Sequence, residues 1–305
     1  MLVNCENCGE EIKKRPSKIK TLKNIYCSKK CKIEIRHGCK KNSRFFEKID
    51  TEEKAYWLGF ICADGWMAKS EPSFGIGLGV RDKNHLSKIA DLFDVKISED
   101  EKRVQIQVYN PITYEHLLDK DVVPLKSYID CFKVFDYIPE YLMNHFIRGW
   151  FDGDGSISLM KKNASEFSIV GTLGNIEKIQ NLILENVEIL NKTKILPCKN
   201  IFALKWGGSS QLMDLREWLY KDATVFLERK KDKFDKVHIK NIKGTSKYRG
   251  VHKQKTDDKW VAQISVSGKI HRLGAFFEEN EAALAYNKSL IKFNKSLNYK
   301  NIIKE

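Results

Sequence analysis

A repeat with a spacing of 90 residues, measured from Asp64 to Asp154, constrains the fold of this chain more than any other feature. Its two copies are AYWLGFICADGW (55–66) and HFIRGWFDGDGS (145–156). Both place a glycine among apolar residues and follow it with an Asp-Gly pair. Each copy predicts a hydrophobic helix that ends at the glycine after the aspartate. A chain that repeats a unit in this way is expected to fold as two similar halves.

Segments with period-two alternation of apolar and polar residues follow each predicted helix. Such segments form a sheet with one buried face and one free face. They are FGIGLGV (74–80), VQIQVYN (104–110), EFSIVGT (166–172) and IFALKWG (201–207). We therefore expect an α+β fold with a pseudo-symmetric, duplicated core and antiparallel sheets. The two halves should span residues 45–135 and 136–240.

Two glycines lie in the middle of the predicted helices, at Gly59 and Gly149. Glycine there costs about 1 kcal/mol relative to alanine, so a gain elsewhere must offset it. Close approach of the two helix backbones across a pseudo-twofold axis is the simplest such gain. It would bring Asp64 and Asp154 together, and two close carboxylates repel unless cations bridge them. Oxygen ligands suit Mg²⁺, and paired metal ions are a known solution for phosphodiester hydrolysis.

The motifs WLGFICADG (57–65) and IRGWFDGDG (147–155) resemble those of the LAGLIDADG homing endonucleases. The resemblance covers residues 45–240, and one motif per half implies the single-chain, pseudo-dimeric form of the family. It implies a core of the αββαββα type with saddle-shaped antiparallel sheets. It implies that Asp64 and Asp154 are the catalytic, magnesium-binding acids of a nuclease that makes a double-strand break in a long DNA target. The first copy departs from the family pattern at Cys62, where the second has Asp152. That position is not the family's essential acid.

The resemblance also implies a basic or amide side chain near the scissile phosphates. Gln107 and Lys205 align between the halves, within VQIQV and IFALK. We expect Lys205 to stabilise charge and Gln107 to position water, with Gln105 facing the DNA. The alternative is that Lys205 and Gln107 are ordinary DNA contacts on the sheet face.

Four cysteines near the N-terminus have the spacing of a zinc site. Cys5-x₂-Cys8 and Cys27-x₃-Cys31 each supply two soft ligands, and four complete a tetrahedron. Residues 1–40 contain few apolar side chains, too few to form a hydrophobic core. A structural Zn²⁺ would stabilise the folded state of this segment instead. They resemble small zinc-binding heads that precede some phage and intron nuclease domains; the alternative is a solvated tail with reduced thiols. Of the other candidates, Cys39 is expected to be a bystander, and Cys131 and Cys198 are expected to be buried. His37 is the alternative ligand, should one of the four cysteines not take part.

The C-terminal segment, residues 245–300, predicts three short strands and a helix over 278–294. The motifs YRGV (248–251), KWVAQI (259–264), LGAF (273–276) and EAALAYN (281–287) resemble the plant apetala-two or ethylene-response-factor DNA-binding domain. The alternative is a structural appendage that does not bind DNA, and Trp260 is expected in the core. Positions implied to touch DNA are Arg249, His252, Gln254, Lys259, Gln263, Ser265 and Arg272.

The formal net charge of +14 at pH 7 favours a polyanionic partner. No apolar run of about 18 residues is present, which argues against a membrane span, and the N-terminus lacks the apolar core of a secretory signal. We expect an intracellular, cytoplasmic monomer from a bacterial or phage gene, with an organelle as the alternative. Its expected partner is double-stranded DNA, and it would act as a mobile-element enzyme of intron homing. Two other functions stay open: an RNA-splicing maturase of the same fold, and a non-catalytic DNA-binding regulator.

Overall fold

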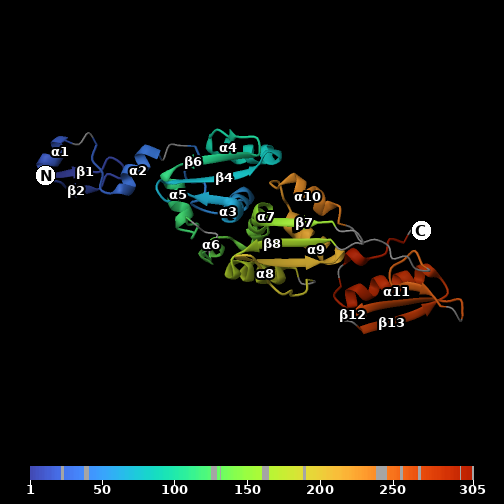
Figure 1. Cartoon of the computed structure of the whole chain (residues 1–305). Coiled ribbons are helices and arrows are strands. Elements are labelled where there is room, and N and C mark those ends of the chain that lie inside the picture. Colours follow the sequence, from blue (N-terminus) through green and yellow to red (C-terminus); the bar gives the residue numbers. More distant parts are fainter. Residues whose placement is uncertain are drawn as a thin grey trace. The chain divides into compact units, whose positions relative to one another are not determined.

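The computed structural model describes most of the chain (Figure 1). The chain divides into two compact units. The described residues are 1–21, 24–37, 41–124, 129–130, 132–159, 165–187, 190–237, 246–254, 257–266, 269–295 and 297–303. Cys39, Cys131 and the side chain of His37 lie outside them. The first unit comprises Met1–Asp154, Gly171–Asn175 and Ala223–Leu227, and the second comprises the remaining residues. No helix in these described ranges is long and apolar enough to cross a lipid bilayer.

The N-terminal part of the first unit is a small hairpin followed by two helices. Strands β1 (Leu2–Asn4) and β2 (Glu11–Lys13) pair antiparallel, and helices α1 (Pro16–Thr21) and α2 (Lys29–His37) follow. The backbone N–H of Glu6 donates to the Ile25 carbonyl, and the Glu6 carboxylate accepts from the Ile25 N–H at 3.1 Å. Glu6 therefore ties the hairpin turn to the segment before α2.

The first half of the repeat has the predicted αββαββα order. The elements are α3 (Glu52–Asp64), β3 (Gly65–Met67), β4 (Ser73–Gly79), α4 (Lys83–Phe93), β5 (Ser98–Glu99), β6 (Arg103–Tyr109) and α5 (Pro111–Leu118). The antiparallel sheet has the strand order β3-β4-β6-β5. Helix α4 covers one face of this sheet. There the ring of Phe74 packs edge-on against the ring of Phe93, with 5.5 Å between the ring centroids.

The second half repeats this order. Its elements are α7 (Met143–Asp154), β7 (Gly155–Ser158), β8 (Glu166–Gly171), α8 (Leu173–Asn186), β9 (Leu196–Cys198), β10 (Ile201–Gly207) and α9 (Ser209–Tyr220). The sheet order is β7-β8-β10-β9, which matches that of the first half strand for strand. Helix α6 (Phe132–Asp136) precedes this half and α10 (Glu228–Asp235) follows it. The predicted α+β class and the duplicated core are confirmed.

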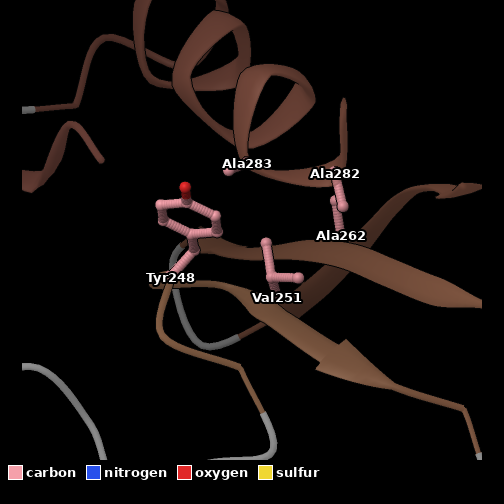
Figure 2. Packing of buried hydrophobic residues seen from close by; sticks show 5 residues of the cluster. All are labelled: Tyr248, Val251, Ala262, Ala282 and Ala283. Carbon is pink, nitrogen blue, oxygen red and sulfur yellow. The ribbon is translucent and has the colours of Figure 1, made fainter. Parts of the chain in front are cut away.

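The C-terminal part is the predicted three-stranded sheet with one helix. Its elements are β11 (Val251–Lys253), β12 (Trp260–Val266), β13 (Lys269–Phe276) and α11 (Glu279–Lys292). The strands pair antiparallel in the order β11-β12-β13. Figure 2 shows α11 lying over one sheet face. The apolar cluster between them is formed by Tyr248, Val251, Ala262, Ala282 and Ala283. Trp260 packs against this cluster, as predicted.

Candidate active site and nucleic-acid interface

Helices α3 and α7 touch backbone to backbone at their central glycines. A Cβ atom added to Gly59 would lie 2.0 Å from the carbonyl oxygen of Phe146, and one added to Gly149 would lie 2.0 Å from that of Tyr56. The two contacts are pseudo-symmetric, because each glycine meets the residue three positions before its counterpart. No side chain fits at either position, so the predicted reason for the mid-helix glycines is confirmed.

The same contact continues to the C-terminal ends of the two helices. A Cβ atom added to Gly153 would lie 2.5 Å from the Cβ of Ala63 and 3.3 Å from the Cβ of Asp64. Asp154 is the next residue along the chain, one Cα–Cα step of about 3.8 Å from Gly153. Both aspartates are exposed, whereas almost every residue in the preceding two turns is buried. The structure therefore brings two solvent-facing acids to the same end of one helix pair.

Asp152, the other acid of the second motif, lies inside the protein. Its Oδ2 accepts hydrogen bonds from the Tyr56 hydroxyl and the Leu227 backbone N–H, both at 2.8 Å. The Tyr56 hydroxyl also lies 2.8 Å from Nε2 of the buried His85. Cys62, at the equivalent position of the first motif, is likewise buried. The position two residues before each exposed aspartate thus serves packing and internal hydrogen bonding.

A buried ion pair holds residues 223–227 against the helix pair. Arg148 is fully buried, and its guanidinium donates to Glu52 at 2.6 Å and to the Val225 carbonyl at 3.0 Å. Burial alone would raise the pKa of the Glu52 carboxyl. Hydrogen bonds from Thr224 and Val225, together with the Arg148 charge, outweigh burial and lower the pKa below its usual range. The charged carboxylate therefore anchors this segment.

The sheet of the first half leaves one face uncovered. Along β6 the side chains alternate strictly, with Val104, Ile106 and Val108 buried. The exposed side chains of β6 are Arg103, Gln105, Gln107 and Tyr109. On β4 their cross-strand partners are three glycines and Ser73, and the ring of Trp66 on β3 lies over one of these glycines, Gly75. A flat surface with guanidinium, amide and aromatic groups suits contact with nucleic acid.

Gln107 and Lys205 have similar local surroundings in their own sheets. The Gln107 amide donates to Glu71 at 2.6 Å and to the Ser73 hydroxyl at 3.0 Å. Lys205 donates to Glu166 at 2.9 Å across its own sheet. Each therefore carries a carboxylate partner on a sheet surface. The catalytic roles assigned to Gln107 and Lys205 stay predictions.

The four predicted zinc ligands converge at one point. All sulfur atoms of Cys5, Cys8, Cys27 and Cys31 lie within 4.8 Å of one another. The Cys8–Cys27 and Cys27–Cys31 sulfur separations are 3.6 and 3.3 Å. Four thiolates about 2.3 Å from a central Zn²⁺ would be roughly 3.8 Å apart, so the donor set fits zinc in type and spacing.

Backbone geometry explains how the sequence builds this cluster. The first pair spans the β1–β2 turn, where Gly9 has a φ of +75° and donates its N–H to the Cys5 carbonyl at 2.9 Å. The second pair lies at the start of α2, where the Ser28 hydroxyl accepts from the Cys31 N–H at 3.1 Å.

The four thiols share protons unevenly without a metal. Burial raises the pKa of Cys5, but backbone hydrogen bonds at Cys27, Cys8 and Asn7 lower it to about 6. The hydrogen bond that the Cys27 thiol donates to the Cys31 sulfur raises the pKa of Cys27 to about 12. A divalent cation that replaces the protons would let all four sulfurs act as ligands.

The C-terminal sheet presents most of its predicted DNA contacts on the face away from α11. Val251 and Ala262 pair and face the helix, so the flanking pairs face outward. By this register the outward positions are His252, Gln254, Lys259, Gln263, Ser265 and Arg272. Arg249 differs, because its guanidinium stacks 4.6 Å above the Tyr299 ring and is half-buried. Burial lowers its pKa.

Two details differ from or add to the sequence analysis. Cys198 is exposed on edge strand β9, so the prediction that it is buried is wrong. Its neighbour across the hairpin is Ile201, and the short edge strand receives no cover there. Arg103 and Tyr109 were missed as surface candidates, although their period-two spacing with Gln105 would have found them.

Comparisons with known proteins give matches of fold only. No protein-family model matches the chain, and no curated protein matches it. Among solved structures, the LAGLIDADG meganuclease I-AabMI bound to uncleaved DNA is 14% identical. That alignment covers 61% of this chain and 88% of that one, with a TM-score of 0.42. The LAGLIDADG homing endonuclease I-GzeII in complex with its DNA target is 15% identical. That alignment covers 59% of this chain and 87% of that one, with a TM-score of 0.41.

A third solved structure is the N-terminal LAGLIDADG domain of DUF199/WhiA. It is 13% identical over 59% of this chain and 88% of that one, at a TM-score of 0.39. Similarity at this level leaves the function to be inferred from the residues of the chain itself.

Proposed function

We propose that this protein is a divalent-metal-dependent DNA endonuclease. The observation that carries the proposal is the pair of exposed aspartates, Asp64 and Asp154, at the joined C-terminal ends of α3 and α7. Two helices of similar length, glycine contacts that exclude any side chain, and an acid at the C-terminal end of each helix make a site with twofold character. Phosphodiester hydrolysis on two antiparallel strands calls for such a pair.

Asp64 and Asp154 would hold Mg²⁺ through carboxylate oxygens, with water and phosphate oxygens completing the coordination shell. When bound, Mg²⁺ supplies an acidified water and neutralises charge on the phosphate. The open β6 face would lie against DNA through Gln105 and Gln107, and β10 would contribute Lys205. Lys205 would place a cation against a phosphate, and Gln107 would orient a water through its amide. The proposal extends to a double-strand break at a specific site, as in intron homing.

The terminal parts would add DNA contacts without taking part in cleavage. The N-terminal cluster would hold a structural Zn²⁺ through its four cysteines. The outward face of the C-terminal sheet carries amide, hydroxyl and guanidinium groups, the kinds that read base edges in a groove. Both parts would lengthen the DNA target beyond the two central sheets.

Selection of cleaved sites from a random DNA library tests the proposal. The full chain is incubated with the library in Mg²⁺, and molecules with new ends are captured and sequenced. We expect recovery of one long consensus site, and no recovery with Asp154→Asn. Absence of any recovered site, together with tight binding of RNA, would favour the maturase alternative. Tight DNA binding without new ends would favour the non-catalytic regulator.

A further inference from the structure

A groove of about 560 Å³ lies beside the open face of the first sheet. One wall is helix α2, another is the β3–β4 turn, and a third is helix α5. Three lysines line it, Lys29 and Lys32 from α2 and Lys69 from the turn. These elements come from separate parts of the sequence, so the lysines meet only in the fold.

The groove is continuous with the surface proposed to contact DNA. Tyr109, the last residue of β6, lines the groove and is 45% exposed. Glu71 also lines it, and its carboxylate is held by Gln107 and by the Ser73 hydroxyl on the sheet. A duplex lying on Gln105 and Gln107 would therefore meet this groove where it passes the end of β6.

The positions of the lysines favour an anionic ligand. Lys29 and Lys32 lie in the first turns of α2, where the helix dipole disfavours positive charge. Within the described ranges, Lys29, Lys32 and Lys69 make no ion pair with a carboxylate. A zinc–thiolate cluster would carry negative charge and would account for a lysine near α2. It does not account for Lys69, which follows β3.

The groove also has a rigid wall with aromatic character. The Tyr114 hydroxyl of α5 donates to the Ala68 carbonyl at 2.6 Å and fixes the β3–β4 turn against the helix. Tyr109 and Tyr114 offer ring surface to a sugar or a base. One further acid, Glu115, is exposed at the groove on α5.

We propose that this groove binds the sugar–phosphate backbone of the DNA that lies on the first sheet, where the duplex continues past the end of β6. The inference rests on the proposed function and adds a specific phosphate-binding surface to it. Lys29, Lys32 and Lys69 would contact phosphates, and Tyr109 would pack against a deoxyribose of the DNA backbone. The N-terminal part would then be positioned to hold flanking DNA.

The test compares two triple variants of the full chain. The groove variant is Lys29→Ala, Lys32→Ala and Lys69→Ala. The control variant, Lys83→Ala, Lys88→Ala and Lys96→Ala, removes the same charge from α4 and the residues after it. Affinity for a 40-base-pair random-sequence duplex is measured across a range of salt concentrations. Far-UV circular dichroism and zinc content check that both variants fold.

We expect the groove variant to reduce the slope of log affinity against log salt by about 2 to 3, since each phosphate-contacting lysine contributes about 1. The control variant should change the slope by less than about 1. A third variant, Glu115→Gln, should bind the duplex at least as tightly as the unmodified protein.

Equal slopes for the groove and control variants would overturn this inference and leave the proposed nuclease function standing. A larger loss of affinity for an RNA duplex than for DNA would overturn it in favour of an RNA ligand. No DNA binding by the unmodified protein would overturn both proposals.

Discussion

At the scale of single residues, the contact between Gly59 and Gly149 sets the geometry of the whole site. Both lie where a methyl group would overlap a carbonyl oxygen of the facing helix. Backbone atoms cannot move aside as a flexible side chain can, so the helices would have to separate. Separation would also part the two helix ends that carry Asp64 and Asp154.

Gly149→Ala is therefore expected to destabilise the protein by about 3 kcal/mol or more. Urea denaturation at neutral pH measures this change. The matched control is Gly79→Ala, because nothing lies within 4 Å of a Cβ added there and its φ of −68° suits alanine. If the Gly149→Ala and Gly79→Ala variants unfold at the same urea concentration, helices α3 and α7 do not pack this closely.

The buried pair of Glu52 and Arg148 predicts a pH dependence of stability. The pKa of Glu52 is lowered in the folded protein, so the stability it contributes is present above its unfolded pKa of about 4.3. That contribution is lost as the pH falls through the folded pKa. At neutral pH, Glu52→Gln would leave Arg148 buried without its counter-charge and should cost roughly 3 to 5 kcal/mol.

Urea denaturation of the Glu52→Gln variant at pH 7 and pH 3 checks the sign of this effect. We expect the difference in stability from the unmodified protein to narrow at pH 3, because below the unfolded pKa the parent loses part of the stability that ionised Glu52 contributes. The control is Asp50→Asn, whose exposed ion pair with Lys54 should contribute little to stability. If the difference in stability between the Glu52→Gln variant and the unmodified protein widens at low pH, the pKa of Glu52 is not lowered by folding.

At the scale of elements, the N-terminal hairpin and α2 should depend on a metal. We expect the purified chain to bind one Zn²⁺ and to lose it on Cys31→Ser. Cys198→Ser should keep it, because Cys198 is exposed on β9 and outside the cluster. Elemental analysis after dialysis measures the stoichiometry. Equal zinc content in both variants would place the metal elsewhere.

The C-terminal sheet makes a separate prediction about its outward face. Arg272 faces outward beside Gln263, and its guanidinium donates to Gln254 at 2.9 Å. Arg272→Ala should weaken binding to the selected DNA site by roughly 10- to 100-fold. Lys288→Ala removes a charge from α11, on the other side of this part, and should have little effect. The comparison uses titrations in the same buffer, and similar losses would indicate a non-specific charge effect.

Element types were predictable wherever the apolar period was strong. The bounds of β6 and β10 were predicted to within one residue. Apolar and polar residues alternate along both segments, as expected for a sheet with one covered face. The glycine contacts followed from the energetic penalty of glycine in a helix. Gly65 ends α3 as predicted, but its φ of −81° is extended rather than left-handed, because the chain enters β3 directly.

Contacts between distant residues were not predictable. No local pattern in the sequence predicts that Arg148 is buried. It is fully buried because Glu52, 96 residues earlier, and residues 224–225 surround it. The groove at Lys29, Lys32 and Lys69 combines three elements whose packing no local pattern encodes. Exposure of Cys198 depends on which strand lies at the sheet edge, and topology decides that.

At the scale of the whole molecule, charge and duplication give one consistent account. The chain carries a formal net charge of +14, so its affinity for DNA should fall steeply as salt rises. The first unit contains both motif helices, so both aspartates belong to one compact body. Each half repeats the same strand order and supplies one acid, which suits a substrate with two strands.

Cleavage of a plasmid carrying the selected site tests the central claim most directly. In Mg²⁺, the unmodified protein should convert supercoiled plasmid to linear DNA, and Asp94→Asn should match it. Asp94 is an exposed acid in a left-handed conformation that asparagine tolerates, so it controls for loss of charge. Asp64→Asn and Asp154→Asn should each give no linear product. Linear product at the unmodified rate from both variants would contradict the account.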